Sequence, residues 1–136
     1  MTDDKLLTEA ARSPVARLAT IGATGVDLVP ITFVMTGSTV VTAVDHKPKT
    51  TRRLQRLANI ERDSRVTILI DHYDDDWTSL WWVRLRGLAR VLVEGPRVVT
   101  AIEGLVAKYP RQYADMPPPG PVIEVDITEV RTWRAS

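Results

Sequence analysis

The chain has 136 residues and is expected to form one domain spanning residues 1–136. Hydrophobic residues make up 44% and charged residues 26%, as in an ordinary globular protein, and the net charge of +1 excludes the broad positive field of a general nucleic-acid binder. Cysteine is absent and only two histidines occur, which excludes disulfides, thiolate catalysis and a histidine-rich metal centre.

The opening sequence and the hydropathy pattern contain no membrane or secretory signal. The sequence MTDDKLLTEAARS is acidic and lacks the apolar core of a signal peptide. No apolar run approaches the roughly 18–20 residues that a membrane-spanning helix needs. We therefore expect a cytoplasmic protein with no membrane partner.

The N-terminal part of the chain predicts a helix, a hairpin and a third strand. The helix is expected over Asp3–Arg12, and the strands over Val15–Ile21, Val26–Val34 and Ser38–Val44. The turn sequences GATG and TGS separate the strands. Pro30 cannot donate a ladder hydrogen bond, so the second strand should lie at a sheet edge or carry a bulge.

A basic turn follows the third strand and leads into an amphipathic helix expected over Thr51–Arg62. Five cations fall within ten residues of this segment: Lys47, Lys49, Arg52, Arg53 and Arg56. Amide N–H groups at a helix N-terminus, the helix dipole and adjacent cations together make an anion site. The first hypothesis is therefore a small ligand that carries a phosphate, and the alternative is a solvated helix face.

The second half of the chain predicts three more strands and a helix. The strands are expected over Arg65–Tyr73, Leu80–Glu94 and Ile123–Thr128, and the helix begins near Pro96. Gly87 interrupts the long strand and should mark a bend or bulge. The total is six strands with two or three helices. Antiparallel strands on short turns favour a small β-barrel with helices packed outside it.

Two other groups of charged residues have simpler interpretations. The acidic loop Asp74–Asp76 lacks the length and terminal glutamate of an EF-hand, so a solvated turn is favoured and no metal site is expected. The arginines of the long strand lack interleaved exposed aromatic residues beyond Trp82. We therefore expect no nucleic-acid partner.

Three segments together carry a resemblance to a known superfamily: ARLATIGATGVDLVPITFV (16–34), DHKPKTTRRLQRLANIERDSRVTILID (45–71) and DHYDDDWTSLWWVRLRGLARVL (71–92). In this order they resemble the split β-barrel superfamily of flavin- and deazaflavin-binding proteins, which includes the pyridoxamine-phosphate-oxidase-like proteins. The tandem-tryptophan strand is similar to the actinobacterial oxidoreductases that use coenzyme F-420. The resemblance implies a mainly β, FMN-binding-like fold: a six-stranded antiparallel split β-barrel with flanking helices.

The resemblance also implies a cofactor site. The cofactor phosphate would be held by the basic turn and the start of its helix, at Lys47, Pro48, Lys49, Thr50 and Arg53. The ring system would lie near two neighbouring strands, at Leu18, Ala19, Thr20, Pro30 and Thr32. The superfamily places this site at a homodimer interface, which Trp77 and Trp82 would reach from the partner subunit.

The residues give one reason to prefer coenzyme F-420 to FMN. The deazaflavin carries an oligoglutamate tail, which suits the additional cations Arg52, Arg53 and Arg56 better than the single phosphate of FMN. The leading hypothesis is an F-420-dependent oxidoreductase that passes hydride to an unidentified small molecule. The alternatives are an FMN-dependent pyridoxamine-phosphate-oxidase-like enzyme and a non-catalytic protein that binds F-420, haem or biliverdin.

Overall fold

The computed structural model describes residues 2–45 and 51–136. In chain order the elements are α1 (Asp3–Arg12), β1 (Ala16–Ile21), β2 (Val26–Ile31), β3 (Val34–Thr36), β4 (Thr39–Ala43), α2 (Thr51–Arg62), β5 (Arg65–His72), the 3-10 turn η1 (Trp77–Ser79), β6 (Trp81–Leu92), α3 (Pro96–Lys108), α4 (Pro110–Tyr113) and β7 (Val122–Arg134).

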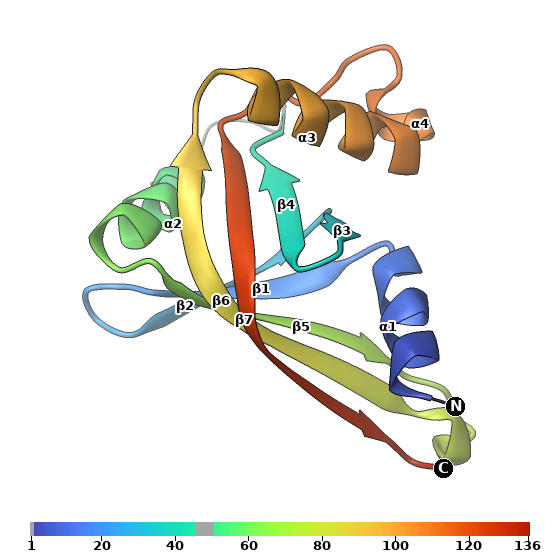
Figure 1. The fold of residues 1–136 in the computed structure, drawn as a ribbon. Helices are drawn as coiled ribbons and strands as arrows, with labels where there is room; N and C mark the ends of the chain where they lie inside the picture. The colour runs from blue at the N-terminus through green and yellow to red at the C-terminus, as the bar shows by residue number, and fades with distance from the viewer. Residues whose placement is uncertain (1, 46–50) are drawn as a thin grey trace.

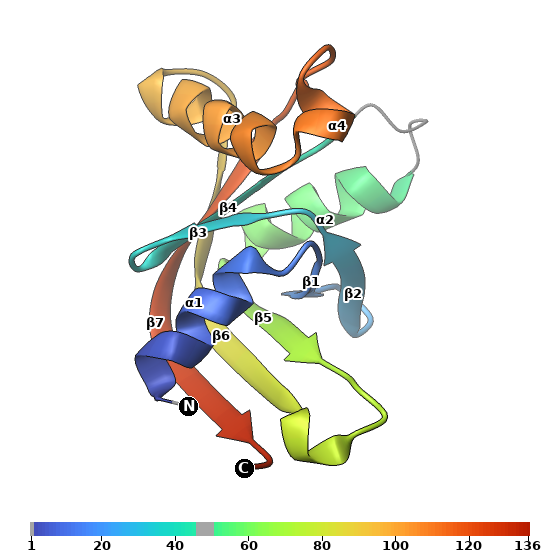
Figure 2. The ribbon, with the colours of Figure 1, turned by 90° about the vertical axis from the view of Figure 1, so that its right-hand side faces the viewer.

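All the strands belong to one antiparallel sheet with the order β2-β1-β5-β6-β7-β4-β3. The sheet curls into half a barrel, and the long strands β6 and β7 run through its middle (Figure 1). Helix α2 lies at one side of the curl, while α3 and α4 lie together at one end (Figures 1 and 2). This arrangement confirms the mainly β fold with flanking helices.

The sheet has seven strands, and the prediction of six was wrong. The predicted strand Val26–Val34 divides into β2 and β3, which form opposite edges of the sheet. Between them the N–H of Phe33 donates to the hydroxyl of Tyr109 at 3.1 Å instead of to a neighbouring strand. The sequence of residues 26–34 concealed this crossing, because both halves of it have the composition of a strand.

Pro30 and Gly87 have the structural positions that the sequence predicted. Pro30 is on the edge strand β2, where its missing N–H costs no ladder bond. The β6–β7 register shifts between Arg86 and Gly87. A Cβ at Gly87 would collide with the backbone carbonyl of Asp126 and lie 2.7 Å from the Val125 side chain, so only glycine fits this close approach.

The core consists of two clusters. The larger cluster fills the inside of the curled sheet and includes Leu18, Phe33, Ile68, Leu85 and Ile123, all buried. The smaller cluster lies beneath α3 and α4 and includes Ala43, Ala101, Leu105, Tyr109 and Val122. Burying each large aliphatic or aromatic side chain stabilises the fold by about 1.5–3 kcal/mol. No helix in residues 2–45 and 51–136 is long and apolar enough to cross a membrane.

Candidate functional site

A pocket of about 370 Å³ lies between the β1–β2 hairpin and helix α2. We call it the hairpin–helix pocket, and it is lined by Thr20, Asp27, Leu28, Val29, Gln55 and Arg56. Helix α2 packs on β1 and β6 and begins at Thr51, directly after the sequence Lys-Pro-Lys-Thr. The pocket therefore brings the predicted ring strand and the helix that follows the basic turn to one place.

A buried amide connects the two walls of this pocket. Asn59 on α2 is fully buried, and its Nδ2 donates to Thr20 Oγ1 at 3.0 Å and to Asp27 Oδ2 at 2.6 Å. Its Oδ1 accepts from Gln55 Nε2 at 2.8 Å. The amide thus has a partner for each of its N–H groups and for its oxygen, as a buried amide requires. Helical periodicity alone did not reveal this residue.

A second pocket, of about 530 Å³, opens on the outer face of the sheet. This outer-face pocket is lined by β1 residues Ala19 and Thr20 and by side chains of β5 and β6, including Arg86 and Leu88. Thr20 lines both this pocket and the hairpin–helix pocket, so the two adjoin at β1. Together they offer aliphatic walls, hydroxyls and guanidinium groups.

The residues predicted to lie beside the ring do not all turn toward these pockets. Ala19 lines the outer-face pocket and Thr20 lines both, whereas the side chain of Leu18 is fully buried in the core. Pro30 is exposed on the edge strand. Thr32 lies in the crossing after β2, with its hydroxyl 3.1 Å from the hydroxyl of Tyr113. The structure therefore brings Ala19 and Thr20 together and gives Leu18 and Thr32 other contacts.

The predicted tryptophans belong to η1 and to the first residues of β6. This segment lies at the end of the sheet away from α2 (Figure 1). Trp77 is 68% exposed in η1, and its indole N–H donates to the Tyr73 hydroxyl at 3.4 Å. Trp82 is half-buried on β6 beside Trp133 of β7, with the Arg84 guanidinium 5.7 Å from its ring centroid. Neither tryptophan lines the hairpin–helix pocket of its own chain.

The predicted phosphate turn, Lys47, Pro48, Lys49 and Thr50, lies outside the described residues, and so does the side chain of Arg53. Arg56 is the described cation of α2 that lines the hairpin–helix pocket, where it is half-buried. Arg56 lies more than one helical turn beyond the start of α2. A ligand bound at the basic turn would therefore reach Arg56 by extending along the helix.

A lysine–tyrosine cluster holds the crossing from β2 to β3. Lys108 Nζ donates to the carbonyl oxygens of Phe33 and Ala11, at 2.9 and 3.0 Å, and lies 3.7 Å from the Phe33 ring centroid. Burial lowers the pKa of Lys108 to about 8 and raises the pKa of Tyr109. The cluster ties α1, the crossing and α3 together, which is a structural role.

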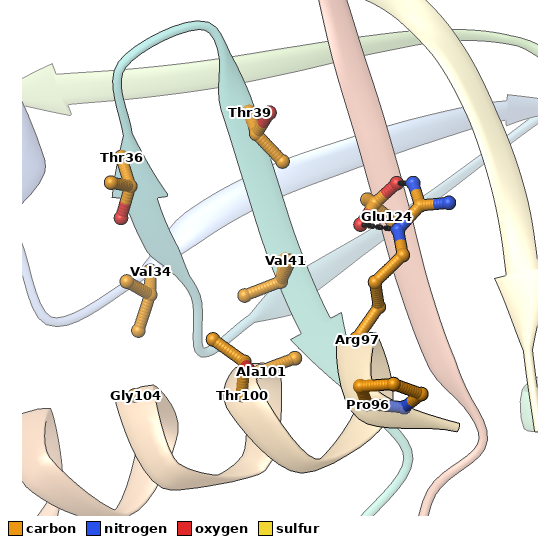
Figure 3. A pocket seen from close by; sticks show the side chains of 10 residues that line it. All are labelled: Val34, Thr36, Thr39, Val41, Pro96, Arg97, Thr100, Ala101, Gly104 and Glu124. Atoms are coloured by element: carbon orange, nitrogen blue, oxygen red, sulfur yellow. Dashed lines mark hydrogen bonds and ion pairs between the residues drawn. The ribbon is translucent and has the colours of Figure 1, made fainter. Parts of the chain in front are cut away.

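A third pocket, of about 380 Å³, lies between α3 and the β3–β4 hairpin. Figure 3 shows the aliphatic side chains of Val34, Val41 and Ala101 around it, with Gly104 on the helix. Arg97 reaches from the start of α3 to the buried carboxylate of Glu124 (Figure 3). The same carboxylate also accepts from Arg90. This α3 pocket is therefore apolar, and its charges are already paired.

Among residues 2–45 and 51–136, no group of three or more histidine, aspartate or glutamate side chains is placed to hold a metal ion. The hairpin–helix pocket, as far as the described residues line it, presents a hydroxyl, an amide, a carboxylate and a guanidinium beside aliphatic side chains.

The sequence profile of the pyridoxamine 5'-phosphate oxidase family matches residues 2–134. The chain belongs to this family. The match confirms the predicted relationship at the level of the family and leaves the cofactor subgroup open. None of the curated proteins compared with the chain matches it.

Several solved structures share the fold. A FAD-binding protein from Mesorhizobium loti matches with a TM-score of 0.75 at 13% identity, covering 100% of this chain and 96% of that one. The conserved hypothetical protein Rv2991 from Mycobacterium tuberculosis matches with 0.74 at 20% identity, covering 99% and 86%. The FAD binding protein from Mycobacterium smegmatis matches with 0.59 at 19% identity, covering 98% and 96%. At these identities the likeness extends to the fold alone.

Proposed function

We propose that this member of the pyridoxamine 5'-phosphate oxidase family is an oxidoreductase that binds coenzyme F-420 and passes hydride to a small-molecule acceptor. The observation that carries the proposal is the hairpin–helix pocket. It joins the strand predicted to lie beside the cofactor ring to the helix that follows the basic turn. Leu28, Val29 and the cation Arg56 all line this pocket, and Val29 lies on the face of β2 that also carries Asp27.

The residues present fit a flavin-type group. Such a group needs an apolar wall for its rings, a few polar partners at the ring edge and cations for its phosphate. Val29 supplies apolar surface on the same face of β2 as Asp27, Thr20 supplies a hydroxyl, and Arg56 with the Lys-Pro-Lys-Thr sequence supplies positive charge. A bound deazaflavin or flavin would supply the hydride chemistry. The chain would bind it, orient it and exclude water, which requires no cysteine.

Two cofactors compete for this site. The arginines of α2, Arg52, Arg53 and Arg56, favour coenzyme F-420 because its tail carries several carboxylates. FMN is the second candidate, and two observations favour it. The matched family is described as pyridoxamine 5'-phosphate oxidase, and two structures with the same fold are described as FAD-binding proteins. A non-catalytic carrier of either cofactor would use the same pocket. Haem is less well supported, because the His72 ring stacks on Trp81 with centroids 5.7 Å apart.

A homodimer is part of the proposal. The outer face of the sheet exposes Leu28, Leu69 and Leu88 from three different strands, at 66%, 37% and 46%. The strand register puts them on one face, beside the outer-face pocket. Apolar groups gathered on an exposed face are typical of an interaction surface. A second copy on this face would bring Trp77 and Trp82 toward the partner's cofactor site.

The test is a parallel titration of the purified apo-protein with coenzyme F-420 and with FMN, followed by quenching of tryptophan fluorescence. Tight binding of the deazaflavin with weak binding of FMN supports the proposal. Tight binding of FMN alone moves the protein to the flavin-dependent alternative, and binding of neither contradicts a cofactor role. A second assay separates enzyme from carrier: an enzyme accelerates oxidation of the reduced cofactor when an acceptor is added, and a carrier protects it.

A further inference from the structure

We propose that Asn59 is a positioning residue, which fixes the β1–β2 hairpin to α2 so that the ring and the phosphate of one cofactor are held simultaneously. This inference rests on the proposed function and extends it to a residue that makes no direct contact with the ligand in the proposal. Its role would be to set the separation between the two walls of the hairpin–helix pocket.

The hydrogen bonds of Asn59 run between elements. Both N–H groups of its amide leave α2 and bind the hairpin, one at Thr20 of β1 and one at Asp27 of β2. The amide oxygen is held within the helix by Gln55, one turn earlier. Because Asn59 is fully buried, water cannot replace these partners at low cost. The amide therefore connects three elements through one side chain.

The hairpin is built to present Asp27 to this amide. A Cβ at Gly22 would lie 2.7 Å from Asp27 Oδ2 and 2.8 Å from the Gly25 carbonyl oxygen, so a larger residue would displace the carboxylate. The N–H of Gly22 donates to that same carbonyl at 2.7 Å, which closes the turn. Glycine at position 22 thus leaves room for the carboxylate that accepts from Asn59.

The hairpin needs such a link because β2 is an edge strand, paired with β1 on one side only. Ile31 packs in the core at the far end of the strand, but Val26 and Leu28 near the turn are 69% and 66% exposed, so packing contributes little to the position of the turn end of β2. A hydrogen bond from a buried amide on α2 gives the strand a second attachment. That attachment is at Asp27, which is followed along β2 by Leu28 and Val29, two further lining residues of the pocket.

The consequence for binding follows from two-point attachment. A ligand anchored at two places binds far more tightly than through either place alone, provided that the protein holds both places at the correct separation. In the proposed site the ring contacts the hairpin and the phosphate contacts the start of α2. Loss of the Asn59 link would leave each half-site intact while reducing the advantage of binding both.

The experiment compares each cofactor with its phosphate-free form: FMN with riboflavin, and coenzyme F-420 with the phosphate-free deazaflavin. The measured quantity is the dissociation constant of the phosphate-free form divided by that of the phosphate-bearing form. In Asn59→Ala and Asp27→Ala this ratio is expected to fall toward one by about tenfold, because only the phosphate-bearing ligand uses both anchors. A purely structural role would weaken both ligands by the same factor.

Two variants provide the controls. Asp27→Asn removes the same charge as Asp27→Ala but keeps an oxygen that accepts from Asn59, so it is expected to retain the wild-type ratio. Glu61→Ala changes an exposed residue of the same helix and should leave both dissociation constants unchanged. If Asn59→Ala does not fold, as judged by circular dichroism, the two variants of the exposed residue Asp27 still test the positioning role.

The outcomes are distinct. A ratio that collapses in Asp27→Ala and returns in Asp27→Asn supports the positioning role. If the wild-type protein binds the cofactor and the two Asp27 variants have equal ratios, the positioning role is overturned and the proposed function stands. Failure of the wild-type protein to bind either cofactor overturns the proposed function and this inference together.

Discussion

The hairpin–helix pocket and the α3 pocket have nearly the same volume, about 370 and 380 Å³, and differ in what lines them. The first is bordered by an amide, a carboxylate, a hydroxyl and the guanidinium of Arg56, supplied by three elements. The second is lined mainly by aliphatic side chains with three threonines, and its arginine is paired with buried Glu124. The two pockets therefore differ in their lining and not in their volume, and the first has the charged and amide groups that a ligand with an anionic part requires.

The largest expected effect concerns the partner subunit. If the hairpin–helix pocket is completed across a dimer, Trp82→Ala should weaken self-association by about 2–4 kcal/mol, the range of an aromatic hot spot. Light scattering should then show a shift toward monomer, with weaker cofactor binding. Val93→Ala removes an exposed apolar side chain just beyond the other end of β6 and is the matched control. A clean dimer in Trp82→Ala would contradict an interface role for this residue.

The next effect tests whether the basic turn belongs to the same site. Lys49→Ala should weaken cofactor binding by about 1.5–3 kcal/mol, the usual contribution of a hydrogen bond to a charged group. Lys5→Ala, on the exposed side of α1, should have no such effect and controls for loss of net charge. Fluorescence titration gives both dissociation constants. An unchanged constant in Lys49→Ala would remove that residue from the site.

A smaller effect, of opposite sign, tests the α3 pocket. A Cβ at Gly104 would lie 3.8 Å from the nearest Val34 atoms, which is ordinary contact, so nothing in α3 prevents alanine there. Gly104→Ala should therefore stabilise the fold by about 0.5–1 kcal/mol through helix propensity, without changing cofactor affinity. Urea denaturation and the cofactor titration measure the two quantities. A large loss of affinity would show that the α3 pocket also serves binding.

The smallest effect is a pH dependence of stability at the lysine–tyrosine cluster. The Lys108 pKa falls from 10.5 to about 8 in the folded state, so between pH 8 and 10.5 the unfolded chain binds more protons than the folded one. Stability should therefore rise with pH from about 8 to 10. Above pH 10 the raised pKa of Tyr109 acts in the opposite direction, because the folded phenol keeps its proton.

Urea midpoints at pH 7.5, 8.5 and 9.5 would measure the rise, and Lys108→Met should abolish it. Lys108 is only half-buried, so water reduces the size of the effect. A flat profile in the wild-type protein would show that the amine keeps its ordinary pKa.

The features that the sequence predicted correctly depend on local chemistry. Helix α1 has the predicted bounds, and the side chain of Thr2 accepts from the N–H of Lys5 at its start. Helix α2 also has the predicted bounds. Pro30 marks an edge because it has no N–H to donate, and Gly87 marks a bulge because it has no Cβ to collide with β7. Each of these predictions needed only a few neighbouring residues.

The features that the sequence missed depend on distant partners. The crossing at Phe33 is set by Tyr109, 76 residues further along the chain. Asn59 is separated from Thr20 by 39 residues and from Asp27 by 32. Within α2 it reads as one polar residue beside Ile60, on the buried side of the helix. A single sequence, read without related sequences, contains no signal that pairs such distant residues. The polar residue is visible in the sequence, but its hydrogen-bond partners are not.

The split of the strand 26–34 has a mechanical consequence. The two edges of the sheet, β2 and β3, are consecutive along the chain and separated by Thr32 and Phe33 alone. In a closed barrel a ladder of hydrogen bonds would join the two edge strands. Here the gap between the edges, the seam, is spanned by the main chain of Thr32 and Phe33, which acts as a covalent strap. The seam cannot widen beyond the reach of that strap where β2 ends and β3 begins, so the main chain restrains the two edges from separating there. A circular permutant with its new termini between Thr32 and Phe33 would cut the strap and release both edges at once.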